Sequence, residues 1–136
     1  MRVIVLLFLL VTGLVSSCNL EPAHSVYTNV LIPFSDRIVP EHGIVGQPVN
    51  ISASAMAENG CWLNIRFVLI QKDDLEYEMV ALADFESYGA CTDMIVYGDT
   101  TVSFIPDRTG NHVITFWMTQ VTSVADTVVV AEAQGR

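Results

Sequence analysis

The chain has 136 residues, which suits one domain, and 51% of them are hydrophobic while only 15% are charged. Six Lys and Arg against fifteen Asp and Glu give a formal net charge of −9. This acidic balance excludes the clustered basic side chains that bind nucleic acids or a polybasic membrane site. A chain this apolar can also bury enough surface to fold, which excludes extended disorder.

The first element in chain order is an apolar N-terminal segment. After the positive start Met1-Arg2, a predominantly apolar run covers residues 3–15. This run is shorter than the roughly 20 residues that cross a bilayer and is typical of the apolar region of a secretory signal. It ends in Val15-Ser16-Ser17-Cys18.

This ending resembles the lipobox of bacterial lipoproteins, in which an aliphatic residue and small residues precede an obligatory cysteine. The resemblance implies that residues 1–17 are a cleaved lipoprotein signal peptide and that Cys18 carries the lipid. The protein would then be held at the membrane of the cell envelope. Asn19 is not the aspartate that favours the inner membrane, so the outer membrane is expected. The alternative is an ordinary signal peptide with a chance cysteine.

The segment that follows is of mixed polarity and holds two prolines. We expect residues 18–33 to be the lipidated N-terminus and a tether, with a short edge strand near residues 26–32 as an option. A single folded domain is expected over residues 34–133, followed by a C-terminal tail of residues 134–136.

Beyond the tether, turn-forming residues recur roughly every eight to twelve positions, and the segments between them alternate apolar and polar residues. Period two is the signature of half-buried strands. No helical periodicity lasts for three turns. About seven strands are therefore expected, in an all-β, antiparallel β-sandwich.

Two segments resemble bacterial Ig-like domains. Residues 46–51 (GQPVNI) are similar to the entry of their second strand, and residues 104–112 (FIPDRTGNH) to the corner before their penultimate strand. The resemblance implies an Ig-like sandwich and carries no function. That corner often holds a tyrosine whose hydroxyl bonds back to the turn. Here His112 takes its place, and we expect its ring N–H to make a similar bond.

The cysteine count fits this interpretation. Lipidation of Cys18 leaves Cys61 and Cys91 as a pair, and an oxidising compartment would let them join in a disulfide. The closed loop of about 31 residues would be worth roughly 3–4 kcal/mol. Two unrelated thiols are the alternative, since no CxxC motif and no nearby histidine indicates zinc.

An acidic stretch covers residues 73–86. Asp73 and Asp74 precede Glu76 and Glu78, which alternate with apolar residues. The pattern favours a hairpin turn and a solvated strand face that protects a sheet edge, with a calcium site as the alternative.

The histidines are scattered along the chain, and the sequence contains no recognisable catalytic triad. The sequence therefore predicts no enzyme, no cofactor and no metal site.

The most informative pattern is aromatic. If Leu63 and Ile65 point inward on one strand and Ile114 on another, Trp62 and Trp117 point outward. In an Ig-like sandwich these two strands are neighbours, so one outer face would bear both tryptophans. Exposed aromatic side chains among polar groups often mark a binding surface. The candidate binding residues are Trp62, Asn64, Arg66, Thr115, Trp117 and Thr119.

Two alternatives stay open for this face. Another segment could cover it, which would make the tryptophans a small second core. A one-residue bulge would also turn either strand over.

These observations predict a lipid-anchored, non-enzymatic binding or accessory module of the cell envelope. Its partners would be the membrane, through the lipid on Cys18, and an envelope protein or a glycan, with no nucleic acid. The alternative is an inhibitor of a basic hydrolase of the lysozyme type, acting through the loop at residues 87–92 that Cys91 would pin. Binding of a basic enzyme should weaken strongly with ionic strength.

Overall fold

The computed structural model describes residues 23–133, and its regular secondary structure there is entirely β-strand. The expected signal peptide, Cys18 and the C-terminal tail lie outside the described residues. Within residues 23–133, no helix has the length and apolarity that a membrane span requires. The strands are β1 (His24–Ile32), β2 (Phe34–Ile38), β3 (His42–Ile44), β4 (Val49–Ala57), β5 (Trp62–Asp73), β6 (Glu76–Tyr88), β7 (Val96–Phe104), β8 (Gly110–Trp117) and β9 (Ser123–Ala131).

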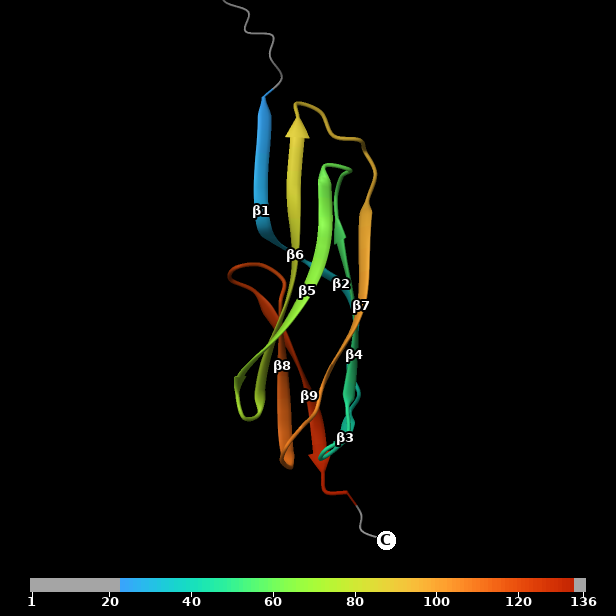
Figure 1. Cartoon of the computed structure of the whole chain (residues 1–136), viewed down its shortest axis with the longest axis vertical. Helices are drawn as coiled ribbons and strands as arrows, with labels where there is room; N and C mark the ends of the chain where they lie inside the picture. Colours follow the sequence, from blue (N-terminus) through green and yellow to red (C-terminus); the bar gives the residue numbers. More distant parts are fainter. Residues whose placement is uncertain (1–22, 134–136) are drawn as a thin grey trace, which may run out of the picture.

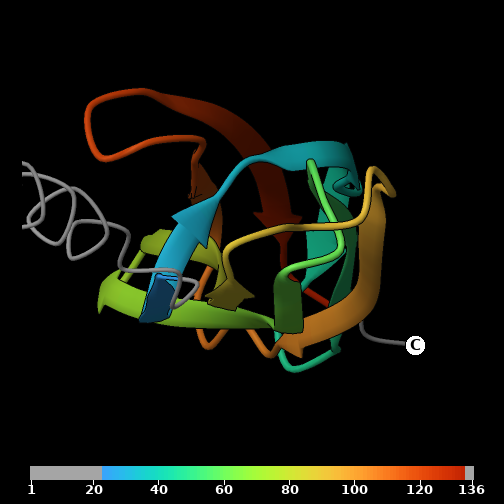
Figure 2. The same ribbon diagram turned by 90° about the horizontal axis from the view of Figure 1, so that it is seen from above.

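The strands form two sheets that pack face to face (Figures 1 and 2). The smaller sheet has the order β2-β4-β7. In the larger, six-stranded sheet β6 pairs with β5 along one edge. Along its other edge β6 pairs first with β8 and then with β1, and β9 and β3 follow β8. The predicted all-β sandwich is confirmed, with nine strands in residues 23–133 where about seven were expected. The pairs β3–β9 and β6–β8 are parallel, so the expectation of a wholly antiparallel sandwich was wrong.

The strand order corrects one expectation. Strands β5 and β8 were expected to be neighbours, but β6 lies between them, and β6 runs parallel to β8. Strand β6 holds most of the acidic stretch of residues 73–86, so this stretch lies in the middle of the sheet. The expectation that it protects a sheet edge was wrong. The core-facing residues of β6 explain this position, because Tyr77, Met79, Ala81 and Ala83 are all buried while the glutamates take the opposite side. A long strand with one fully apolar face is suited to the middle of a sheet.

The folded domain begins earlier than expected. Most of the expected tether is strand β1, which pairs with β6 over nearly its whole length and buries Ile32 in the core. Pro33 marks the crossing from β1 in one sheet to β2 in the other. A proline cannot donate to a strand ladder, so it suits this break. The segment between Cys18 and the fold is thus only residues 19–23.

The core lies between the sheets and contains one buried polar side chain among the described residues, His112. Its Nε2 donates to the carbonyl oxygen of Arg108 at 3.1 Å. The ring packs near Tyr77 and Phe104, with centroid distances of 6.0 and 5.7 Å. The predicted bond from His112 back to the turn is confirmed.

A disulfide links the turn before β5 to the loop after β6. The Cα atoms of Cys61 and Cys91 are 5.3 Å apart and their sulfurs are bonded. The predicted pairing of these two cysteines is confirmed. The bond fixes the loop of residues 89–95 to the body of the sandwich.

Candidate functional site

The candidate site is the side of the six-stranded sheet that faces away from the smaller sheet, called here the outer face. The strand register places its side chains in rows, because Arg66 lies opposite Leu82, and Val68 opposite Val80. No strand of the described part of the chain covers this face. Its central residues are Arg66, Val68, Ile70, Glu78, Val80, Leu82, Asp84, Val113, Thr115 and Trp117.

A bulge in β5 decides where Trp62 points. The pairing of β5 with β6 shifts between Leu63 and Arg66, and Asn64 has a φ of 55°. The extra residue turns the start of the strand over. Trp62 therefore packs toward the core, with its ring 5.1 Å from that of Phe85 and nearly edge-on. The prediction that Trp62 lies on the outer face was wrong for this reason.

Strand β8 has no such bulge. Its buried side chains alternate through Phe116, so Thr115 and Trp117 lie half-buried on the outer face. Since β6 separates β8 from β5, Trp117 lies two strands away from Arg66. The face carries one tryptophan, Trp117, and not the expected pair.

Thr119 belongs to the turn after β8. Its Oγ1 accepts hydrogen bonds from the backbone N–H groups of Val121 and Thr122, at 3.2 and 3.0 Å. The hydroxyl groups of Thr119 and Thr122 are also 2.6 Å apart. These bonds shape the tight connection from β8 to β9. Thr119 therefore supports the turn and is not part of the outer face.

A polar cluster sits beside the apolar rows, centred on Asp84. Its Oδ1 accepts from the backbone N–H of Asn29 at 2.9 Å and from Arg66 at 3.1 Å. Its Oδ2 accepts from the side-chain amide of Asn64 at 3.1 Å. Arg66 also donates to the carbonyl oxygen of Asn64 at 3.0 Å and to the side chain of Asn29. The four side chains join β1, β5 and β6.

Two bulges bring this cluster together. Asn29 in β1 has a φ of 56°, close to the 55° of Asn64 in β5, and each asparagine lies where its strand slips against β6. Asparagine tolerates the left-handed backbone better than most residues. The two bulges lie on opposite edges of β6, and Asp84 accepts hydrogen bonds from both.

The electrostatics of the cluster keep Asp84 ionised. The backbone N–H of Asn29, and then the side chains of Arg66 and Asn64, lower the pKa of Asp84 to about 2. Hydrogen bonds to the charged form stabilise it. Arg66 is held in a fixed position by this carboxylate and still reaches solvent. It can therefore offer further N–H donors to a partner at the edge of the apolar rows.

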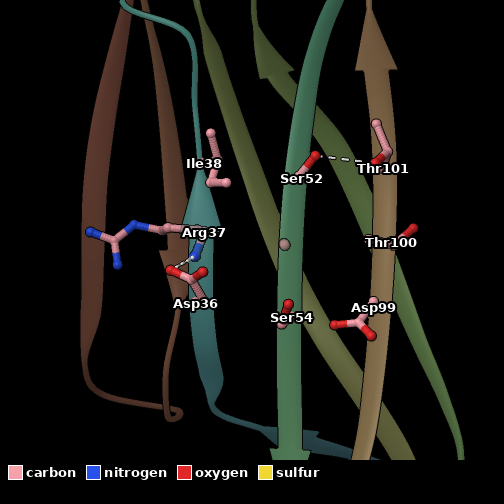
Figure 3. Close-up of a pocket in the computed structure, with 9 residues that line it drawn as sticks. Asp36, Arg37, Ile38, Ser52, Ser54, Asp99, Thr100 and Thr101 are labelled. Atoms are coloured by element: carbon pink, nitrogen blue, oxygen red, sulfur yellow. Dashed lines mark hydrogen bonds between the residues drawn. The ribbon is translucent and has the colours of Figure 1, made fainter.

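A second surface lies on the outer side of the smaller sheet. It is a groove of about 390 Å³ along β4, in which Ser52 and Ser54 form the floor. Figure 3 shows Asp36 and Asp99 on either side of Ser54. Ser52 and Thr101 share a hydrogen bond of 3.1 Å.

In residues 23–133, no three His, Cys, Asp or Glu side chains lie close enough together to hold a metal ion.

Sequence reasoning missed Asn29 and Asp84. The available signal was an asparagine inside the apolar strand YTNVLI, because such a residue favours a bulge. Of the predicted residues, the structure gathers Asn64 and Arg66 around Asp84 and places Thr115 and Trp117 on the same face, across β6.

Comparison with protein-family models, with curated proteins and with solved structures found no match to this chain.

Proposed function

We propose that the protein is a lipid-anchored, non-enzymatic binding module of the cell envelope, which holds a partner protein on the outer face of its six-stranded sheet. The lipobox-like ending at Cys18 supports the anchor. The disulfide between Cys61 and Cys91 supports export, because such bonds persist in oxidising compartments.

One observation carries the binding proposal: the outer face is apolar along its middle, and no strand within residues 23–133 covers it. Val68 and Ile70 are exposed there, beside the half-buried Val80, Leu82 and Trp117. Contiguous apolar surface on a soluble domain marks interaction sites. Arginine and tryptophan are the side chains that most often anchor protein interfaces, and Arg66 and Trp117 occupy opposite sides of this surface.

The kind of partner follows from the aromatic content. A glycan would stack on exposed aromatic rings, and only one of the two tryptophans lies on this face. The row of aliphatic side chains suits the surface of another protein instead. This supports a protein, of the two expected kinds of partner, over a glycan.

A crosslinking experiment with matched variants tests the proposal. The tagged lipoprotein is crosslinked in its native cells as wild type, as the double variant Val68→Glu/Trp117→Ala, and as the control Ile38→Glu on the smaller sheet. Ile38 is also an exposed apolar residue, so the control carries a similar new charge. We expect a partner that is captured with wild type and control and lost with the double variant. A partner retained by the double variant would contradict the proposed face.

The inhibitor hypothesis stays a prediction about a different surface. It requires the predicted loop of residues 87–92 to meet a basic enzyme, and the sequence of those residues holds no carboxylate. The structure places Ser87 and Tyr88 in β6 and continues the loop to residue 95, which adds a single carboxylate, Asp93. Strong attraction would have to come from the net charge of the whole chain. A binding constant that falls steeply with ionic strength would favour this hypothesis over the outer face.

A further inference from the structure

One end of the sandwich gathers the start of the fold and the disulfide. His24 at the start of β1 pairs with Tyr88 at the end of β6, and the loop of residues 89–95 is joined through Cys91 to Cys61. Figure 1 shows this end at the top, where the chain enters the domain. It is called here the tether end.

The tether end presents apolar side chains in a fixed arrangement. Tyr88, Met94 and Ile95 are 63%, 59% and 51% exposed. The ring of His24 stacks on Tyr88 at 4.3 Å, and the Tyr88 hydroxyl donates to Glu86 at 2.8 Å. The disulfide holds the loop that carries Met94 and Ile95. This exposed apolar surface is therefore built into the fold.

The opposite end has a different character. There the turn after β5 and the turn after β7 meet, and Arg108 contacts both Asp74 and Asp107. Asp73, the last residue of β5, directly precedes Asp74. Ile44 and Ile105 are exposed at the far end as well, so the difference between the ends is one of arrangement: Tyr88, Met94 and Ile95 gather at the tether end, whereas the Arg108 network occupies the far end.

The length of the connecting segment fixes which end can meet a membrane. Five residues separate Cys18 from His24, so the chain between them spans at most about 20 Å. Strand β6 alone, with 13 residues, is about 43 Å long. An anchor on Cys18 therefore keeps the tether end close to the bilayer.

We infer that the tether end is a membrane-contact surface, with Tyr88, Met94 and Ile95 resting in the headgroup region of the lipid layer. The inference rests on the proposed lipidation of Cys18. Tyrosine favours this interfacial zone because its ring is apolar and its hydroxyl is polar. Glu58, Glu86 and Asp93 lie at the same end, so an uncharged, zwitterionic lipid surface suits it better than an anionic one.

The inferred contact has two consequences for the rest of the molecule. The long strands stand away from the bilayer, which leaves the outer face of the six-stranded sheet open to a partner. The disulfide-pinned loop lies against lipid and is not presented to a soluble enzyme. The membrane contact thus favours the binding module over the inhibitor.

Photocrosslinking from two ends of one strand tests the inference. A benzoylphenylalanine replaces Met94 just before β7, or Ile105 just after it, in the acylated protein reconstituted into phosphatidylcholine vesicles. Ile105 is 64% exposed, so the two positions are matched in exposure and differ in the end that carries them. We expect lipid adducts at position 94 and none at position 105. Equal adducts at both positions, or adducts only at 105, would overturn the membrane contact.

A failure of the membrane contact can be distinguished from a failure of the lipid anchor. The intact mass of each purified variant first shows whether Cys18 is acylated. An unacylated chain would overturn the anchor and the membrane contact together. An acylated chain that yields no adduct at position 94 would overturn the membrane contact alone. Retention of the Cys61–Cys91 disulfide in each variant, checked by non-reducing peptide mapping, confirms that the tether end is folded.

Discussion

At the scale of single residues, the two tryptophans differ in their surroundings. Trp62 packs against Phe85 beneath the end of the six-stranded sheet, whereas Trp117 lies on the open face. We expect Trp62→Ala to lower the free energy of unfolding by about 3 kcal/mol, the lower part of the range for a buried tryptophan because Trp62 is only partly buried. Trp117→Ala should cost about 1 kcal/mol or less. Urea denaturation measures both, and the reverse order would contradict the assigned orientations.

His112 should show the value of its bond to the turn. The variant His112→Phe keeps a flat ring beside Tyr77 and Phe104 but removes the N–H that reaches the carbonyl oxygen of Arg108. A lost hydrogen bond of this kind costs about 1 kcal/mol. We therefore expect a modest drop in the urea midpoint with the fold intact. A more stable variant would show that the imidazole contributes only its shape.

Asp84 should make the stability depend on acid. Its pKa is about 2 in the fold, below the ordinary value of 3.8, so the folded state favours the ionised form. This contribution to stability is complete above the ordinary value and is lost as the pH falls from about 4 toward 2. We expect Asp84→Asn to flatten that part of the profile of urea midpoint against pH. A profile parallel to that of the wild type would contradict the role of the cluster.

At the scale of elements, the disulfide joins two connections that lie far apart in the sequence. It closes a sequence separation of 30 residues between the turn before β5 and the loop after β6. Opening such a loop costs roughly 3–4 kcal/mol in the chain-entropy account. We expect the double variant Cys61→Ser/Cys91→Ser to lose stability of this size in urea denaturation. A midpoint equal to that of the oxidised wild type would show that packing alone holds the loop.

The strands that could be predicted from the sequence are those with strict alternation. The alternation in β4, β6 and β8 matches the buried positions Ile51, Met79 and Ile114. The corner at His112 could be predicted because it depends on a local motif. The start of β5 could not, because one extra residue at Asn64 reverses the side on which Trp62 lies.

The order of the strands in the sheets could not be predicted from the sequence, for a related reason. Alternation indicates which face of a strand is buried but not which strands lie beside it. The central place of β6 depends on pairings with β1, β5 and β8, from distant parts of the chain. Asn29 and Asp84 meet only through these pairings, so their cluster emerged from the fold.

At the scale of the whole molecule, the anchor governs location. The variant Cys18→Ser removes the thiol that would carry the lipid and leaves the described domain unchanged in sequence. We expect this variant to be soluble or unprocessed, while the wild type sediments with membranes and is released by detergent. Fractionation followed by immunoblotting measures the difference. A processed Cys18→Ser protein that stays with the membrane would contradict the lipid anchor.

The central claim joins the anchor to the outer face of the six-stranded sheet, and in-cell photocrosslinking tests both most directly. A photoreactive side chain is placed at Thr115 on that face or at Ser54 on the smaller sheet, two positions of similar partial exposure. Each is made with and without Cys18→Ser. We predict one specific protein adduct at position 115 that is absent at position 54 and depends on Cys18. The same adduct at both positions, or one at position 54 alone, would contradict the account.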